Sequence, residues 1–179
     1  RVLLHVGRIA MEKNLDLVIE GFSELVKKEP MARLLIVGEG PAKRHYQECV
    51  REKGLDGRII FTGFIPDDEL PQVYAACNAS VIASKFETQG LVGLEAMASG
   101  KPVAGINYRA VKELIHEGEN GFVFEDDPSS CAEAMRAALD HSEEMRGSTR
   151  RYALGYSAEL SVEKLVELYK YAIERKKMV

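Results

Sequence analysis

The sequence of 179 residues predicts an α/β fold: a Rossmann-like, three-layer α/β/α domain with a six-stranded parallel sheet and further helices at its C-terminal end. Two observations support this fold class. Short aliphatic runs alternate with amphipathic segments, a pattern typical of βαβ units with right-handed crossovers. The runs are apolar throughout, which is typical of strands covered by helices on both faces. A hydrophobic content of 46% allows one domain of this length to bury a core.

Six aliphatic runs are the predicted strands. They are Val2–Val6, Arg33–Val37, Arg58–Phe61, Ser80–Ala83, Pro102–Ile106 and Phe122–Phe124. The residues before the sixth run, Gly118 and Asn120-Gly121, predict a turn that leads into it.

Amphipathic segments between these runs are the predicted helices. Asn14 is expected to cap the first, Gly54 to end the second, and Asp67 or Asp68, after Pro66, to begin the third. The predicted helices are Leu15–Lys28, Ala42–Lys53, Asp68–Cys77, Leu91–Ala98 and Ala110–Glu117.

After the sixth run the pattern changes to consecutive helices, predicted at Ser129–His141, Glu143–Leu154 and Ala158–Lys177. The last of these has more apolar residues at helical spacing than one buried stripe needs. The excess suits either burial within this domain or a face for a partner domain. Because residue 1 comes directly before a strand and is not Met, we expect the chain, 1–179, to be one domain of a longer protein.

The bulk composition argues against several classes of protein. A net charge of −4 disfavours a nucleic-acid-binding protein, whose domain is usually basic. No apolar run reaches the roughly 18 residues of a membrane span, and no signal peptide is visible. The three cysteines, Cys49, Cys77 and Cys131, lack metal-site spacing, so reduced thiols and no metal are expected. The expected location is cytoplasmic, with peripheral contact to a membrane left open.

Histidines contribute little to the functional reading. His5 lies in the first predicted strand, where a core histidine is favoured over one at the edge of a cleft. The other three, His45, His116 and His141, lie in polar helical surroundings and are expected to be solvated.

The loops after the strands form the candidate site, because ligands of open α/β sheets bind beyond the carboxyl ends of the strands. After the first strand, Gly7 allows close backbone approach, and Arg8 and Lys13 bring two cations to one loop. Each cation alone suits a surface ion pair, whereas the two together suit a diphosphate. Gly38 follows the second strand, where a plain turn is at least as well supported as a phosphate loop.

Two glutamates, Glu87 and Glu95, have seven residues between them. Gly90 begins the intervening helix, whose N-terminus favours a phosphate. Glu95 lies in an apolar run and is expected to be buried, which requires hydrogen-bond partners. Two ribose hydroxyls would supply them, and Glu87 would accept from a second sugar. An ion pair with Arg8 or Lys13 is the alternative for both glutamates, and a glycosidase-like acid pair is disfavoured by these cations.

Several stretches form an ordered series of motifs. They are Val6–Ile9 with Glu12–Asn14, Leu35–Pro41, Phe61–Ile65, Glu87–Glu95 followed by Ala96–Val103, Glu113–Ile115 and Asn120–Phe122. In this order they resemble the C-terminal, donor-binding domain of the retaining glycosyltransferases of family 4 (glycosyl transferases group 1), one half of the two-domain GT-B architecture. The resemblance covers almost the whole chain, and 158–177 is similar to the closing helix of that family.

The resemblance implies roles by position. Arg8 and Lys13 would hold the donor diphosphate, Glu87 would contact the donor sugar, and Glu95 would bind the ribose hydroxyls. The donor would also contact Gly7 and Gly38, the backbone at Gly90 and Leu91, and the loop Gly63-Phe64-Ile65, which would lie against the base.

The activity implied is transfer of a sugar, with retained configuration and no obligatory metal, from a UDP- or GDP-sugar to an acceptor sugar, lipid or polysaccharide. The missing N-terminal domain would bind the acceptor, so this domain alone is expected to be inactive. Two stretches that border the donor sugar, Thr88-Gln89 and Tyr108–Val111, depart from the family pattern. The alternatives are a non-catalytic nucleotide- or sugar-binding module and a sugar-nucleotide epimerase of the same architecture.

Overall fold

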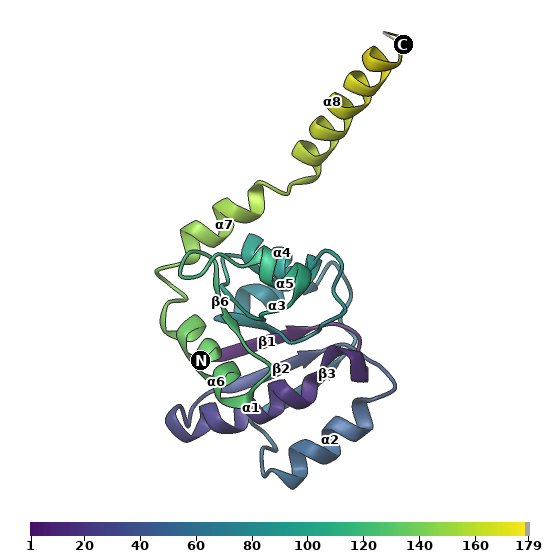
Figure 1. Ribbon diagram of the computed structural model, residues 1–179. Helices are drawn as coiled ribbons and strands as arrows, with labels where there is room; N and C mark the ends of the chain where they lie inside the picture. The colour runs from purple at the N-terminus through teal and green to yellow at the C-terminus, as the bar shows by residue number, and fades with distance from the viewer. Residues whose placement is uncertain (178–179) are drawn as a thin grey trace.

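The computed structural model describes residues 1–177 and confirms the predicted fold class (Figure 1). Helices cover both faces of a six-stranded sheet. The strands are β1 (Val2–Val6), β2 (Arg33–Val37), β3 (Ile59–Gly63), β4 (Ala79–Ile82), β5 (Val103–Ile106) and β6 (Gly121–Phe124). Each coincides with a predicted run to within two residues at either end.

The sheet has the strand order β3-β2-β1-β4-β5-β6, and every neighbouring pair is parallel. The chain adds strands outward from β1 to β3 and then returns to place β4 beside β1. The direction of strand addition therefore reverses between β1 and β4. Ligands of such sheets bind at this switch point, beyond the carboxyl ends of the strands.

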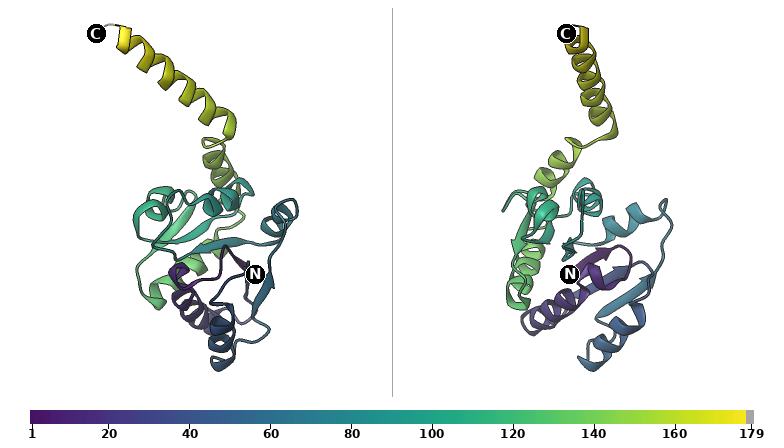
Figure 2. Two further views of the ribbon diagram at one scale, coloured as in Figure 1. Left: turned by 90° about the vertical axis from the view of Figure 1, so that its right-hand side faces the viewer. Right: turned by 45° about the vertical axis from the view of Figure 1, so that its right-hand side comes forward.

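The helices α1 to α6 form two layers, one on each face of the sheet (Figures 1 and 2). The layer of α1, α2 and α6 covers one face, and α3, α4 and α5 cover the other. The helices are η1 (a 3-10 turn, Met11–Lys13), α1 (Leu15–Lys28), α2 (Lys43–Glu52), α3 (Leu70–Ala76), α4 (Leu91–Ala98), α5 (Arg109–Leu114), α6 (Pro128–Asp140), α7 (Arg146–Leu154) and α8 (Ala158–Lys177).

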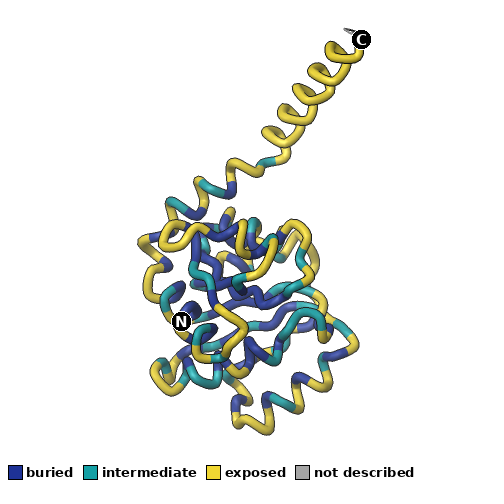
Figure 3. Tube along the Cα trace, in the orientation of Figure 1, coloured by how far each residue is buried: buried dark blue, intermediate teal, exposed yellow. Residues whose placement is uncertain are grey.

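Small residues let the helices pack closely on one another and on the sheet. A Cβ at Gly21 of α1 would lie 2.9 Å from Cβ of Cys131 on α6, and one at Gly93 of α4 would lie 2.5 Å from a methyl of Leu114. The core is the sheet with the inward faces of both helix layers, as the buried residues of Figure 3 show. Because interiors are close-packed, larger residues at either glycine would separate these elements.

The last helix, α8, extends away from the α/β body (Figures 1 and 3). Its apolar side chains are exposed: Leu160, Val162, Leu165, Val166, Leu168, Tyr169, Tyr171 and Ile173. Of the two alternatives for its apolar excess, burial within this domain is therefore wrong. Within residues 1–177, no helix is both long enough and apolar enough to span a bilayer.

One predicted cap and several helix ends differ from the prediction, among them the start of α7, at Arg146 instead of Glu143. Asn14 precedes α1 in a left-handed conformation (φ 55°), and within the described residues its side chain makes no capping bond. The third helix begins at Leu70 instead of Asp68, because a turn closed by the Pro66 carbonyl precedes it. The fifth ends at Leu114 instead of Glu117, because the buried side chain of Asn120 bonds the Leu114 carbonyl and the His116 amide.

Candidate functional site

Lys13 and Glu87 meet at the switch point of the sheet. Lys13 ends η1 in the loop after β1, and Glu87 lies in the loop after β4. Nζ of Lys13 lies 2.5 Å from Oε1 of Glu87, and the two side chains are 22% and 17% exposed. The ion pair that the sequence left as an alternative is thus present for Glu87. Because the carboxyl ends of β1 and β4 lie side by side, residues 74 positions apart face the same point.

Arg8 is the second cation of the β1 loop. Its side chain is 64% exposed and forms an ion pair with Glu12, one turn further along the chain. The loop therefore presents one largely exposed guanidinium and one partly buried ammonium beside the same strand end. Such a combination suits an anion with several oxygens, since the guanidinium can bind two oxygens at once.

His5 lies in β1 next to this loop and is 2% exposed. Its Nδ1 donates to the carbonyl of Val81 in β4, 3.2 Å away, so Nε2 is the unprotonated nitrogen. Within residues 1–177, Nε2 has no hydrogen-bond partner. A Cβ on Gly7 would lie 3.8 Å from Nε2 and 4.0 Å from Cε of Lys13, so this nitrogen borders the loop. Burial, reinforced by the charge of Lys13, lowers the pKa of His5 to about 4.

A cavity of about 320 Å³ opens at the carboxyl ends of β1, β2 and β3. Five residues that the sequence assigns to the donor line it: Gly7, Arg8, Gly38, Phe64 and Ile65. Phe64 is 71% exposed, so its ring offers a flat apolar surface. Gly63, which ends β3, lies beside the carboxylate of Glu39. The structure thus brings together these residues from three loops.

Gly38 and the neighbouring Gly40 are explained by the contact between two of these loops. A Cβ on Gly38 would lie 2.0 Å from the carbonyl oxygen of Gly7, and one on Gly40 would lie 2.1 Å from that of Ile9. The Gly38 amide donates to the Gly63 carbonyl at 2.8 Å. Only glycine allows such close backbone approach. This turn holds the β1 loop in place, and direct contact of Gly38 with a ligand stays a prediction.

Glu95 is exposed, so the expectation that it is a buried carboxylate is wrong. Its Oε2 accepts a hydrogen bond of 2.8 Å from the hydroxyl of Tyr74, a buried residue of α3. A second cavity, of about 530 Å³, is lined by Tyr74 and Glu95 together with Asp67 and Leu70. Asp67 and Leu70 also line the cavity at the strand ends. The two cavities therefore adjoin.

Burial and the nearby Glu95 carboxylate raise the pKa of Tyr74, so its hydroxyl stays a donor at neutral pH. Tyr74 fixes one oxygen of Glu95 and leaves the other toward solvent. The sequence did not single out Tyr74, because its distance from Glu95 depends on how α3 packs on α4. No local signal in the sequence identifies it.

The N-terminus of α4 lies one turn before Glu95. Gly90 is its N-cap, and within the described residues no side chain caps this end. Leu91, the first helical residue, is 57% exposed. Uncapped amides at a helix N-terminus favour an anion. Asn107, which follows β5 at the same edge of the sheet, has a buried Oδ1 that lacks a partner within residues 1–177.

Comparison with known proteins places this arrangement in a family. Residues 1–155 match the family described as glycosyl transferases group 1, which is most of the chain. The chain belongs to this family. Its fold is the Rossmann-like α/β fold of GT-B glycosyltransferases, and it corresponds to the C-terminal domain of a group 1 enzyme.

Three relatives illustrate the match to this glycosyltransferase domain. The sulfoquinovosyl transferase SQD2 of Arabidopsis thaliana is 37% identical over 149 residues, 81% of this chain and 28% of that protein. The C-terminal domain of the group 1 protein LpcC from Francisella tularensis is 28% identical with a TM-score of 0.77, over 88% of this chain and 86% of that one. The pneumococcal O-GlcNAc transferase GtfA, crystallised with UDP and GlcNAc, has a TM-score of 0.78 at 23% identity, over 97% and 35% of the two chains.

The domain spans about a third of the length of the curated relatives that it matches. It therefore corresponds to a part of those enzymes and not to the whole of any of them.

Proposed function

We propose that this domain binds a nucleotide diphosphate sugar, a UDP- or GDP-sugar, and supplies the donor half of a retaining glycosyltransferase. One observation carries the proposal: the Lys13–Glu87 pair at the β1/β4 switch point. Such a point is where α/β sheets bind nucleotides. Two adjoining cavities, lined at one end by Gly7 and at the other by Glu95, provide the space. The pneumococcal relative crystallised with UDP and GlcNAc supports this choice of ligand.

The diphosphate is assigned to Arg8 and Lys13, with the first amides of α4, at Gly90 and Leu91, as further donors. Charge-assisted hydrogen bonds of this kind are about twice as strong as neutral ones. Lys13 would then be shared between the diphosphate and Glu87. Drawing the ammonium toward the phosphate frees Glu87 to accept from hydroxyls of the sugar.

The ribose is assigned to Glu95 and the base to the loop at Phe64 and Ile65. An exposed carboxylate suits this role, because its ligand arrives from solvent and no buried charge has to be neutralised in its absence. Tyr74 holds one oxygen of Glu95 in place, so the other is oriented for the ribose hydroxyls. Phe64, exposed beside the cavity at the strand ends, offers a face for the base.

The residues of this domain assist transfer through charge. The bond between the anomeric carbon and the diphosphate oxygen breaks, and its electron pair stays on the diphosphate. The acceptor hydroxyl oxygen forms the new bond on the same face of the sugar, and its proton passes to a diphosphate oxygen. Arg8 and Lys13 stabilise the negative charge that develops on the leaving group.

The exposed apolar side chains of α8 suit a face that packs against a further domain of a longer chain. That domain would bind the acceptor and form the second wall of the cleft. The domain described here would then bind the donor without transferring its sugar.

Nuclear magnetic resonance of this domain tests the assignment. Titration with UDP and GDP should shift the amides of Gly7, Arg8, Lys13, Gly90 and Leu91, with saturation for at least one nucleotide. Shifts confined to other surfaces, or none with a folded protein, would contradict the proposal. For the longer chain, the anomeric configuration of the product tests retention: inversion would reject that part of the proposal.

A further inference from the structure

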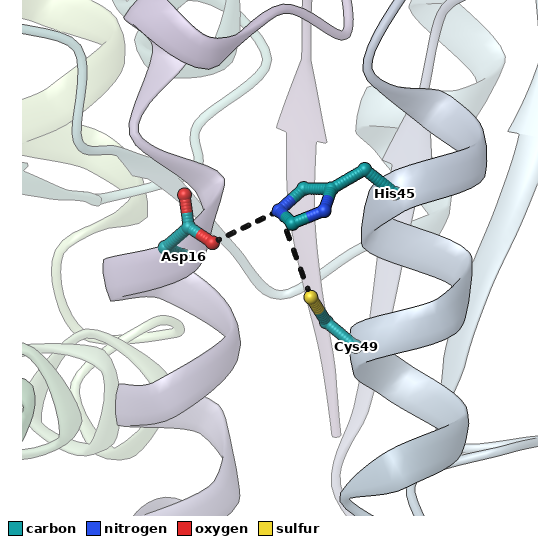
Figure 4. A group of neighbouring side chains, drawn as sticks. All are labelled: Asp16, His45 and Cys49. Atoms are coloured by element: carbon teal, nitrogen blue, oxygen red, sulfur yellow. Dashed lines mark hydrogen bonds and ion pairs between the residues drawn. The ribbon is translucent and has the colours of Figure 1, made fainter.

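Asp16, His45 and Cys49 come together between α1 and α2 (Figure 4). His45 and Cys49 are four residues apart on α2 and so lie on one face of that helix. Asp16 faces them from the first turn of α1. One carboxylate oxygen, Nε2 and Sγ all lie within 4.8 Å of one another.

The distances are close to those of a zinc site. Nε2 of His45 lies 3.7 Å from Sγ of Cys49 and 3.6 Å from Oδ1 of Asp16. In tetrahedral coordination, ordinary zinc bond lengths separate nitrogen and sulfur ligands by about 3.6 Å, and nitrogen and oxygen ligands by about 3.3 Å. Two of the three ligand–ligand distances are therefore close to those around a bound zinc ion, and the third, between Sγ and the carboxylate oxygen, is at most 4.8 Å.

Asp16 is held in position by a residue behind it. The hydroxyl of Tyr46, whose side chain is fully buried, donates to Oδ2 of Asp16 at 3.1 Å. Oδ1 is thereby directed toward His45. The ring of Tyr46 also contacts that of His45 edge to face, with centroids 5.1 Å apart. Partners of this kind orient the ligands of metal sites in proteins.

The surroundings favour a cation with an open coordination position. A cavity of about 390 Å³ borders Asp16 and Cys49 and is also lined by Glu20, Glu52 and Lys53, which forms an ion pair with Glu20. A bound divalent ion would offset the charges of Asp16 and Glu52 and deprotonate the Cys49 thiol. Thiolate, imidazole and carboxylate together are ligands typical of zinc.

We propose that Asp16, His45 and Cys49 bind a divalent zinc-type ion, with the fourth position open to water or another ligand. The ion would link α1 to α2 and fix the first turn of α1, which directly follows the Gly7–Asn14 loop. The sequence predicted neither the site nor a role for His45. Its one signal there is the His45-x3-Cys49 spacing, and the third ligand comes from another helix. The site does not depend on the proposed donor site.

Calorimetric titration of the metal-free domain with Zn²⁺, in a non-thiol reductant, tests the proposal. We expect one ion per chain at micromolar or tighter Kd. Cys49→Ser, His45→Gln and Asp16→Asn should each weaken binding at least tenfold. His141→Gln is the matched control, because His141 is also an exposed histidine beside a carboxylate, that of Glu144. It should change the Kd less than twofold.

Two spectroscopic and chemical readouts make the test independent of the calorimetry. Co²⁺ should give a thiolate-to-cobalt charge-transfer band that Cys49→Ser removes. Zn²⁺ should slow alkylation of Cys49 in the parent chain and not in His45→Gln. Absence of saturable Zn²⁺ binding would overturn the proposal, as would unchanged affinity in both Cys49→Ser and His45→Gln.

Discussion

Lys13 and Glu87 are partners across the β1/β4 switch point, with Nζ of the lysine 2.5 Å from Oε1 of the glutamate. Both side chains are assigned to the donor, one to its diphosphate and one to its sugar. A diphosphate must therefore compete with Glu87 for the ammonium. This competition makes the two residues distinguishable by experiment.

Substitutions of the two partners should change nucleotide affinity in opposite directions. Lys13→Gln should weaken binding of the free nucleoside diphosphate about 10- to 100-fold, since hydrogen bonds to charged groups contribute about 1.5–3 kcal/mol. Glu87→Gln should tighten it several-fold, because the competing carboxylate is gone. Calorimetry with UDP or GDP measures both, and Lys28→Ala, an exposed lysine at the far end of α1, is the control. Equal weakening by both substitutions would contradict the shared-lysine arrangement.

His5 should make the domain sensitive to acid. Burial and Lys13 lower its folded-state pKa to about 4, against the opposing effects of the hydrogen bond to the Val81 carbonyl and of Glu87. Below its unfolded pKa of about 6.5 the unfolded chain binds the proton more readily, so stability falls as the pH drops from about 6.5 to about 4. Protonation of His5 lowers the unfolding free energy by about 3 kcal/mol in total.

Urea unfolding at pH 7.5 and pH 4.5 measures this loss. His5→Phe should reduce the difference in unfolding free energy between the two pH values by most of that amount. An equal acid sensitivity in parent and variant would show that other groups cause it.

Gly40→Ala should be strongly destabilising. Its Cβ would lie 2.1 Å from the carbonyl oxygen of Ile9, a clash with backbone that no side-chain rotation relieves. Overpacking costs about 1–3 kcal/mol or more. Gly147→Ala on α7 is the matched control: nothing lies within 4 Å of its Cβ, so it should be neutral or stabilising by up to about 1 kcal/mol. Similar melting temperatures for the two variants would refute the loop contact.

Arg109→Gly should stabilise the domain. Arg109 has φ 41°, in the left-handed region that favours glycine, and its guanidinium lies over the Tyr108 ring at 5.1 Å. Glycine at this position removes about 1–2 kcal/mol of backbone strain. The exposed cation–π contact that is lost with the guanidinium contributes roughly 0.5–1 kcal/mol. Arg109→Ala loses the contact and keeps the strained φ, so it should destabilise. A lower unfolding free energy for Arg109→Gly than for Arg109→Ala would be the opposite of this expectation.

The fold was predictable because its signals are local. Short apolar runs and amphipathic segments located all six strands, and the ends that differ depend on particular side chains. Asn120 is an example, since it ends α5 by bonding backbone groups up to six residues earlier in the chain.

Asn14, in one of the motifs, and Arg109, in a stretch that departs from the family pattern, share a backbone conformation. Both residues adopt positive φ, at 55° and 41°. Asparagine tolerates this region and arginine does so at a cost. The sequence marked both positions, whereas their conformation is visible only in the structure.

The candidate site was predictable in position and less so in environment. The loops that carry Arg8, Lys13 and Glu87 do meet, because parallel strands bring their carboxyl ends to one edge. The apolar run around Glu95 suggested burial, but only Gly93, Ala96 and Met97 of α4 are buried, whereas Leu91 and Glu95 are exposed. Tyr74 and the Asp16–His45–Cys49 cluster depend on contacts between helices, for which this single sequence holds no clear signal.

In the proposed function, the two adjoining cavities bind a nucleotide diphosphate sugar through Glu95 and the switch-point cations Arg8 and Lys13. Isothermal titration of this domain with UDP-, GDP- and ADP-sugars, repeated with Glu95→Ala and Tyr74→Phe, tests it most directly. We expect saturable binding of at least one donor, a loss of affinity of tenfold or more in Glu95→Ala, and a smaller loss in Tyr74→Phe. A folded domain that binds none of these donors, or binds one equally well without Glu95, would contradict it.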